Sequence, residues 1–340
     1  MAHVLVTGSA GFIGGYLVQQ LLADGHDVVG LDDYSKYGPV TRSYDRHPRY
    51  RLVEGDASDV TVVEELLRDR DHLIAGAALI GGISYFHTYP YDLLAANERI
   101  IASTCDAAIR AHRSGRLRKV TYISSSMVFE STDHWPSREG DQLAVPPPRS
   151  SYGFQKLATE YFARAAWDQY GLPYTIVRPF NCVGVGEIRA LAQATCSSGT
   201  IKLAMSHVVS DLVQKIVKGQ HPLRILGDGR QVRHYTYGGD LARGIVLAME
   251  HESATNEDFN LSTAESTTVL DLAERIWSRL RPGVPFEVVN DPAFEHDVQK
   301  RIPDVSKARD LLGFTAGVSL DEMLDEVVPW VVGAVEAGRL

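Results

Sequence analysis

The first half of the chain alternates between short apolar runs and segments with helical spacing. The apolar runs are rich in valine and isoleucine and cover residues 3–7, 27–32, 50–56, 72–78, 119–125 and 173–179. Runs of this length are typical of buried strands. Between the first two runs, Ile13, Leu17 and Leu21 lie four residues apart, and a longer helical segment covers about 91–111. Strands that alternate with helices predict an α/β fold built on a doubly wound parallel sheet.

The pattern changes after Asn181. A stretch that contains glycine and serine runs to Thr200, and helix-like segments follow it, with isolated strands at 223–226, 258–261 and 286–289. We therefore expect a second, smaller domain for the substrate, built mostly from the C-terminal half. The expected division assigns residues 1–181 plus about 233–262 to the sheet domain and about 182–232 plus 263–340 to the second domain.

Composition and charge exclude several classes of function. The chain has 340 residues, 44% of them hydrophobic, and a net charge of −9, so we expect no nucleic-acid partner. Three cysteines, Cys105, Cys182 and Cys196, are too few for a disulfide framework or a thiolate metal site, and no metal is predicted. No apolar stretch reaches the length of a membrane span, and the first strand leaves no room for a signal peptide. We therefore expect a cytoplasmic protein with no membrane partner.

A glycine motif joins the first strand to the first helix, with the sequence Gly8-Ser9-Ala10-Gly11-Phe12-Ile13-Gly14. Glycines here permit a tight turn and let backbone N–H groups approach a pyrophosphate at the helix N-terminus. About 20 residues on, the second strand ends at Asp32, whose carboxylate accepts hydrogen bonds from ribose hydroxyls and repels a 2′-phosphate. The sequence therefore predicts a Rossmann dinucleotide site that takes NAD in preference to NADP. The alternative is that the glycines serve only a turn.

The glycine spacing GxxGxxG resembles that of the extended short-chain dehydrogenase/reductase family, in particular its nucleotide-sugar epimerases and dehydratases of the UDP-galactose 4-epimerase type. The resemblance implies cofactor contacts at Asp56, Ala57, Gly76 and Ala77, with Asp56 at the adenine amino group, and a role for Asn97 in holding a nearby helix. Asp33 is either a further cofactor ligand or a solvated loop carboxylate.

Tyr152 and Lys156 form a YxxxK motif on a predicted helix. Residues four apart share a helix face, so the ammonium can lower the pKa of the phenol and bond the nicotinamide ribose, which makes the tyrosine a usable general base. The preceding strand ends in serines 124–126, at the sheet edge where open α/β sheets bind ligands. In the family this strand ends as S/T-x-x-V-Y. Phe129 takes the place of that aromatic residue, so the resemblance assigns the catalytic hydroxyl to Ser125.

The two residues after Ser125 indicate the type of reaction. By the resemblance, 4,6-dehydratases carry Asp-Glu there, glucuronate decarboxylases a Glu, and GDP-mannose 3,5-epimerases a Cys at the second position. This chain has Ser126 and Met127, and neither side chain moves protons at carbon at useful rates. Elimination and C3/C5 epimerisation therefore lack their usual base, and redox chemistry at one carbon remains. Met127 either contacts the sugar or fills the core.

Other segments match the family with departures. Phe129-Glu130 stands where the family has Tyr-Gly, Ala75-Gly76 replaces His-Leu, and His234 stands where Asp is usual. Gly81-Gly82 and Lys202 resemble the glycine pair and the lysine of GDP-mannose 3,5-epimerases, which leaves a GDP-sugar open as the substrate.

The resemblance also identifies substrate-binding residues. Asn181 ends a segment similar to the family's R-x-F-N turn, whose Asn contacts the sugar diphosphate. Arg233 and Arg301 match its two diphosphate-binding arginines, although an isolated arginine is more often a surface residue. Two guanidinium groups suit a diphosphate better than a monoanion. His207 is either a nucleotide contact or an ordinary surface residue.

Together these features predict an NAD-dependent nucleotide-sugar epimerase that acts at C4 of an NDP-hexose or a related sugar through a 4-keto intermediate. One alternative is a dehydratase, a decarboxylase or a GDP-mannose 3,5-epimerase-like enzyme with Cys182, His207 or Lys202 as an unusual base. Another is a non-catalytic NAD-binding sensor or scaffold. The resemblance further implies a homodimer, formed through the helices that start near Tyr91 and Tyr152.

Overall fold

The computed structural model describes residues 1–80, 88–187, 193–196, 199–202, 207–293 and 298–340. Within this part of the chain, seven parallel strands form the central sheet. Their order is β13 (Glu257–Leu261), β6 (Tyr174–Pro179), β5 (Lys119–Ile123), β4 (His72–Ala75), β1 (His3–Thr7), β2 (Asp27–Asp32) and β3 (Tyr50–Glu54). The order reverses between β1 and β4, so the chain forms the doubly wound Rossmann fold that the sequence predicts.

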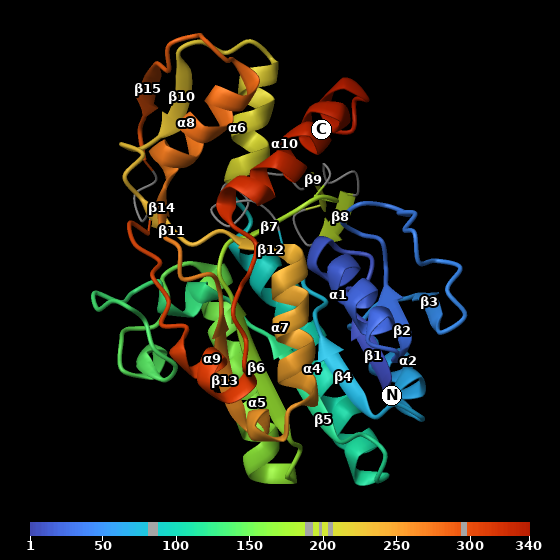
Figure 1. The fold of residues 1–340 in the computed structure, drawn as a ribbon. Helices are drawn as coiled ribbons and strands as arrows, with labels where there is room; N and C mark the ends of the chain where they lie inside the picture. Colours follow the sequence, from blue (N-terminus) through green and yellow to red (C-terminus); the bar gives the residue numbers. More distant parts are fainter. Residues whose placement is uncertain (81–87, 188–192, 197–198, 203–206, 294–297) are drawn as a thin grey trace.

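Helices cover both faces of this sheet because successive strand residues point to opposite sides. Val4 and Val6 of β1 belong to a core shared with α1 (Phe12–Ala23), α7 (Gly238–Glu250) and α9 (Ser306–Leu312). Leu5 belongs to the opposite core, shared with α2 (Val60–Leu67), α4 (Pro90–Arg113) and α5 (Ser151–Tyr170). Figure 1 shows α1 and α7 side by side over the sheet.

A further core, separate from the two on the faces of the sheet, defines what we call the second lobe, which lies above the sheet in Figure 1. It consists of α6 (Val208–Val217), α8 (Val269–Leu280) and α10 (Leu320–Glu336), with the parallel strands β10 (Leu223–Leu226) and β15 (Val288–Asp291). The last strand lies two residues later than the sequence predicts, because its pairing with β10 begins at Val288.

Short strand pairs and turns lie outside the central sheet. β7 (Cys182–Val183) pairs with β12 (Thr236–Tyr237), β11 (Val232–Arg233) pairs with β14 (Thr267–Thr268), and β8 (Gln193–Cys196) pairs with β9 (Gly199–Lys202). Single 3₁₀ turns form η1 (Ser126–Phe129), η2 (Asp141–Leu143) and η3 (Glu252–Ala254). β5 ends earlier than predicted, because Ser125 leaves the sheet and its side chain accepts a hydrogen bond from Met127 at the start of η1.

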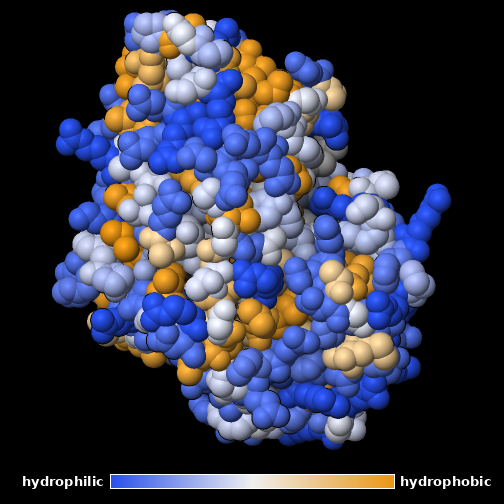
Figure 2. Space-filling model, in the orientation of Figure 1, coloured by the Kyte–Doolittle hydropathy of each residue, from blue (hydrophilic) through white to orange (hydrophobic). Residues whose placement is uncertain are grey.

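The surface in Figure 2 is mostly hydrophilic, and hydrophobic residues form smaller patches, one of them on the second lobe. None of the helices in the described ranges combines the length and the hydrophobicity that a lipid bilayer would require. Among the same residues, no group of three or more His, Cys, Asp or Glu side chains is arranged to hold a metal ion.

Candidate active site

A cleft of about 1170 Å³ contains residues from both lobes and from the carboxyl ends of the sheet strands. Nearly all of the residues singled out from the sequence line it, namely Gly8, Gly11, Phe12, Ile13, Gly14, Asp32, Asp33, Asp56, Ala57, Gly76, Ala77, Ser125, Ser126, Met127, Tyr152, Lys156, Asn181, His207, Arg233 and Arg301. Asn97 lies outside the lining. The backbone of Lys202 ends β9, and its side chain lies outside the described part of the structure.

The glycine loop is compact because side chains would not fit in it. A Cβ atom on Gly14 would lie 2.1 Å from the carbonyl oxygen of Gly8, and one on Gly8 would lie 2.9 Å from the backbone of Ala77. Gly8 also has a φ of +73°, which favours glycine. Gly11, the N-cap of α1, brings no capping side chain to the first N–H groups of the helix. This loop therefore has the close backbone and the helix N-terminus that a pyrophosphate requires.

Asp32 is fixed at the carboxyl end of β2. Its carboxylate accepts hydrogen bonds from the N–H groups of Ala10 and Tyr34, both at 2.9 Å. Burial raises the pKa of Asp32, and these two hydrogen bonds oppose that effect. The exposed Asp33 accepts a bond from Ser35 N–H at 2.9 Å, so it stabilises its own loop at the cleft.

Two further predicted residues support the cofactor half of the cleft. Asp56 is exposed and accepts a hydrogen bond from Ser58 N–H at 2.7 Å. Asn97 is buried on α4, where its amide bonds both backbone groups of Leu79, at 2.8 and 3.0 Å, and the carbonyl of Leu93 at 2.9 Å. Asn97 therefore ties α4 to the segment after β4 that lines the cleft.

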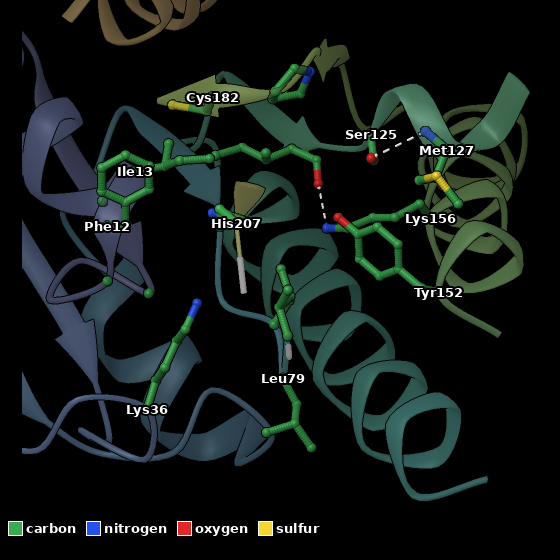
Figure 3. Close-up of a pocket in the computed structure, with 18 of the residues that line it drawn as sticks. Phe12, Ile13, Lys36, Leu79, Ser125, Met127, Tyr152, Lys156, Cys182 and His207 are labelled. Atoms are coloured by element: carbon green, nitrogen blue, oxygen red, sulfur yellow. Dashed lines mark hydrogen bonds between the residues drawn. The ribbon is translucent and has the colours of Figure 1, made fainter. Parts of the chain in front are cut away.

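Tyr152 and Lys156 project from α5 toward Ser125, which follows β5 (Figure 3). A hydrogen bond joins the side chains of Tyr152 and Ser125. The ammonium of Lys156 donates to the carbonyl of Ile123 at 2.8 Å. The three residues that the sequence predicts as catalytic therefore lie together, one helical turn apart on α5 and directly opposite the end of β5.

The charge that lowers the pKa of Tyr152 is not the one that the sequence predicts. Burial raises the pKa of Tyr152, and the effects that lower it are the Ser125 hydrogen bond and the positive charge of Arg301. The sequence had predicted this role for Lys156, whose own pKa falls to about 8 because the ammonium is buried. The ammonium of Lys156 points toward the backbone of β5. The positive charge that lowers the pKa of Tyr152 comes from Arg301 instead.

The 3₁₀ turn η1 supplies the residues next to Ser125. Ser126 and Met127 are both buried at the cleft. Neither has an acid–base group that works at carbon. Glu130, the C-cap of η1, also lines the cleft, and its carboxylate is engaged by Ser150.

Arg233 ends β11, and Arg301 directly follows Lys300, which forms an isolated parallel bridge with Val232. Arg301 N–H donates to the carbonyl of Val232 at 3.2 Å, and the guanidinium of Arg233 donates to the same carbonyl at 2.9 Å. Asn181 has a φ of +36°, and its Oδ1 is buried with no hydrogen-bond partner among the described residues. Two guanidinium groups and an available amide oxygen therefore line the same cleft.

His207 and Cys182 also line the cleft. His207, the N-cap of α6, forms an ion pair with Glu187. Burial raises the pKa of the Cys182 thiol. His234 is not in the lining: its Nδ1 lies 3.0 Å from the carbonyl of Thr263, and burial lowers its pKa. The His234 departure therefore belongs to the packing between β11 and β12.

Lys36, Glu130 and Arg149 line the cleft although the sequence analysis did not assign them to it. Figure 3 shows Lys36 reaching into the cleft from the loop that follows β2. The sequence marked Glu130 only as a departure from the family pattern. Lys36 and Arg149 lie in segments without regular structure, so periodicity could not show where their side chains point.

A Rossmann sheet with a glycine cradle, an acidic end of β2 and a tyrosine–lysine pair defines a dinucleotide-dependent enzyme that transfers hydrogen. The chain belongs to the NAD dependent epimerase/dehydratase family, whose model matches residues 4–262. Its cofactor is therefore NAD.

The known proteins it is similar to include both epimerases and decarboxylases. UDP-glucuronic acid decarboxylase 1 of Arabidopsis thaliana is 29% identical over 330 residues, which cover 96% of this chain and 69% of that protein. UDP-glucose 4-epimerase of Lactobacillus helveticus is 26% identical, over 92% of this chain and 91% of that protein. The structure of UDP-glucuronic acid 4-epimerase of Bacillus cereus, in complex with UDP-glucuronic acid and NAD, is 26% identical with a TM-score of 0.80, covering 97% of this chain and 98% of that chain.

Proposed function

We propose that this nucleotide-sugar epimerase inverts C4 of an NDP-hexose or a related sugar. The observation that carries the proposal is the pairing of Tyr152 with Ser125 directly beside Ser126 and Met127. The first two residues handle a hydroxyl proton, and the second two offer no group that removes a proton from carbon. Redox chemistry at a single carbon needs only the hydroxyl proton transfer that Tyr152 and Ser125 provide.

The residues present fit NAD, because the glycine loop has no room for side chains and Asp32 is held at the end of β2. When bound, NAD supplies the acceptor that takes the C4 hydride and returns it. Tyr152 removes the proton of the C4 hydroxyl, and Ser125 holds that hydroxyl in place. Extraction of the bound nucleotide from the purified protein tests whether Asp32 selects NAD over NADP. We expect to recover NAD, and recovery of mainly NADP would contradict this role.

The second lobe and the connecting strands hold the substrate in this proposal. Arg233, Arg301 and Asn181 bind the diphosphate, and His207 contacts the nucleotide. Ser126 and Met127 face the sugar, and Lys202 is a further candidate there. A 4-keto sugar must turn about its diphosphate link before the hydrogen returns to the other face, so both arginines hold the link and leave the ring free.

The reaction in D₂O tests the proposal. We expect a C4 epimer with no deuterium on carbon after back-exchange of hydroxyls in H₂O, because the C4 hydrogen leaves and returns without meeting solvent. A panel of UDP-, GDP- and other NDP-sugars, followed by proton NMR, identifies the substrate. Mass spectrometry of the product then decides the reaction type.

A decarboxylase is the second candidate, favoured by the similarity to the Arabidopsis thaliana decarboxylase. A decarboxylase adds a solvent-derived proton at C5 in place of the CO₂ that leaves, and a dehydratase or a 3,5-epimerase exchanges a carbon-bound proton through a side chain, so deuterium would enter at C5, C6 or C3. One added mass unit would reject C4 epimerisation and direct the search for a base to Lys202, Cys182 and His207.

The assembly and the domains follow from the same proposal. Two copies associate through α4 and α5, which is supported by exposed aromatic side chains on these helices, Tyr91 (67% exposed), Phe154 and Tyr161. Light scattering should give twice the 37.4 kDa of one chain, and a value near 37.4 kDa at micromolar concentration would overturn this.

Residues 1–181 with about 233–262 form the NAD domain in this proposal, and about 182–232 with 263–340 form the nucleotide-sugar domain. The separate core of α6, α8 and α10 supports this division, whereas α9, which lies within 263–340, packs in the core of the sheet domain. We also place the protein in the cytoplasm, where the free thiols of Cys105 and Cys182 stay reduced.

A further inference from the structure

Glu130 occupies a defined place beside the reacting groups. It is the C-cap of η1, and its backbone N–H donates to the carbonyl of Met127 at 3.1 Å. Its side chain lines the cleft at the position where the resembled family carries glycine. A carboxylate at this position is therefore a property of this chain that the shared YxxxK chemistry leaves unexplained.

Within the described part of the chain, the Glu130 carboxylate accepts three hydrogen bonds, all of them from Ser150. Ser150 N–H lies 3.2 Å from each carboxylate oxygen, and the Ser150 hydroxyl donates to Oε2 at 2.5 Å. Ser150 is the N-cap of α5, where the positive end of the helix dipole favours a carboxylate. Glu130 therefore joins the end of η1 to the start of the helix that carries Tyr152.

The bond to Glu130 also fixes how Ser150 caps the helix. A serine hydroxyl has one proton, and the proton is used in the bond to Glu130. The oxygen is left to accept from Gly153 N–H, which it does at 3.0 Å. Tyr152 lies between these two residues in the first turn, so the bonds on either side of it share a single hydroxyl.

Close contact between η1 and α5 makes this geometry demanding. A Cβ atom on Gly153 would lie 2.8 Å from Oε2 of Glu130 and 2.9 Å from the carbonyl oxygen of Met127. The two elements thus meet at both ends of η1: Ser125 bonds Tyr152 at one end, and Glu130 bonds Ser150 at the other. Loss of the second connection leaves the first turn of α5 held at only one end.

We propose that Glu130 is a positioning residue for Tyr152, which acts by holding Ser150 so that the first turn of α5 keeps the tyrosine hydroxyl on Ser125. The inference rests on the proposed function for its kinetic consequence, and on the contacts above for its structural one. Small displacements of a general base are costly in rate: about 1 Å can cost 10²-fold.

The first test is kinetic. Glu130→Ala should lower kcat roughly 10- to 100-fold while the KM of the NDP-sugar changes less than about threefold, because no substrate contact is removed. Glu130→Gln should restore part of the rate, since its amide oxygen still accepts one bond from Ser150. Ser150→Ala should resemble Glu130→Ala, and the double variant should be no worse than either single one. Unchanged kcat, or an effect confined to KM, would overturn the proposal.

The second test reads the tyrosine itself and does not require turnover. In the NAD-bound protein labelled with 3-fluorotyrosine, the ¹⁹F signal of Tyr152 is assigned by its absence in Tyr152→Phe. Arg301 and Lys156 are kept in every variant, and Glu130→Gln removes the same negative charge as Glu130→Ala, whose loss alone would lower the pKa of Tyr152. Glu130→Ala should shift or broaden the signal and move its titration to higher pH by roughly one unit, because the Ser125 bond that lowers the pKa is weakened.

A matched control separates positioning from general loss of stability. Ser319 caps α10 in the same way that Ser150 caps α5, with its side chain accepting from Glu322 N–H at 3.3 Å, far from the cleft. Ser319→Ala should lower the melting temperature without changing kcat or the Tyr152 signal. If no NDP-sugar is turned over, the proposed function fails while the ¹⁹F test still decides the role of Glu130. An unchanged signal in Glu130→Ala would reject that role even in an active epimerase.

Discussion

Helix α5 presents Tyr152, Lys156 and Glu160 at intervals of four residues, on one stripe of its surface. The first two lie in the cleft, and the third lies one turn further on in the core. The same helix face therefore contributes to two regions, which differ in how far their buried polar groups are paired.

The buried charges of the core region have partners of opposite sign, although Nη1 of Arg178 has no hydrogen-bond partner among the described residues. Glu160 accepts bonds from the guanidinium of Arg178 at 2.7 and 2.8 Å and from the hydroxyl of Ser124 at 2.7 Å. Arg178 also donates to Asp258 at 2.6 Å, and neither Arg178 nor Glu160 has any exposed side chain. Buried charges at this depth are tolerated because each has partners of opposite sign.

The cleft region leaves polar groups under-satisfied. Within the described residues, the buried ammonium of Lys156 donates to one carbonyl, that of Ile123, and Asn181 Oδ1 has no partner. The consequence is visible in the pKa of Lys156, which burial lowers to about 8. Polar groups of the cleft that lack partners lower the stability of the ligand-free protein, whereas the paired groups of the core raise it.

The largest expected effect breaks the cleft side of this comparison. Tyr152→Phe should retain NAD and reduce turnover roughly 10²- to 10⁴-fold, because the hydroxyl that moves the substrate proton is removed. Tyr161→Phe on the same helix is the control, since its ring is 57% exposed and outside the cleft lining. Steady-state kinetics with the active NDP-sugar measures both variants. Activity of Tyr152→Phe within threefold of the natural protein would remove this residue from the mechanism.

The next effect breaks the core side. Arg178→Met should lower the free energy of unfolding by about 3–5 kcal/mol, because Glu160 and Asp258 lose the cation between them. Arg164, whose side chain is 25% exposed and lies 3.5 Å from Asp258, tests the contrast. Arg164→Met should cost less than about 1 kcal/mol. Urea unfolding measures both losses, and equal losses would show that burial does not set the value of these ion pairs.

The sequence alone was sufficient for the sheet and for a set of candidate residues that nearly all line the cleft. Strand runs such as 3–7 and 27–32 are continuous and apolar because both sheet faces are covered, and the parallel order follows from their alternation with helices. The proximity of Tyr152, Lys156 and Ser125 could be predicted because the YxxxK motif puts two of them on one helix face. The third follows a strand at the carboxyl edge of the sheet, where such sheets bind ligands.

The Glu160, Arg178 and Asp258 cluster could not be predicted in this way. Its members come from α5, β6 and β13, and no periodicity links residues so far apart in the chain. The bond from Glu130 to Ser150 is a similar case, since it joins two segments across a long loop. Side-chain direction in such segments depends on tertiary contacts that a local pattern does not contain.

A smaller effect sharpens the core side through pH. Burial tends to raise the pKa of Asp258, but the charges of Arg178 and Lys307 outweigh burial and lower it to about 2. Because the folded pKa lies below the unfolded value near 3.8, the stabilisation is present above pH 3.8 and is lost as the pH falls toward 2. Asp258→Asn should therefore cost about 2 kcal/mol at neutral pH.

Urea unfolding from neutral pH down to about pH 3 checks this, since the difference between the two proteins should shrink in the acid range. Asp310→Asn is the control, because Asp310 forms a surface pair with Arg309 in which both side chains are more than half exposed. A pH-independent difference for Asp258→Asn would mean that packing, rather than charge, is lost.

The smallest effect sharpens the cleft side. The pKa of Lys156 is lowered by burial to about 8, so its ammonium is charged below that pH and becomes neutral above it. Turnover should then fall above about pH 8, by at most about tenfold per pH unit, as the charge on the tyrosine–lysine face disappears. Lys156→Arg should remove this bend, because a guanidinium stays protonated, while the maximal rate falls.

Lys119 supplies the matched control for this last profile. Burial lowers its pKa to about 8 as well, but its ammonium donates to the carbonyls of Ala248 and His251, outside the cleft lining. Lys119→Arg should keep the bend where it is, since the Lys119 ammonium lies outside the cleft that contains Tyr152. If Lys119→Arg moves the bend, or Lys156→Arg leaves it in place, the fall in turnover at alkaline pH comes from a group other than Lys156.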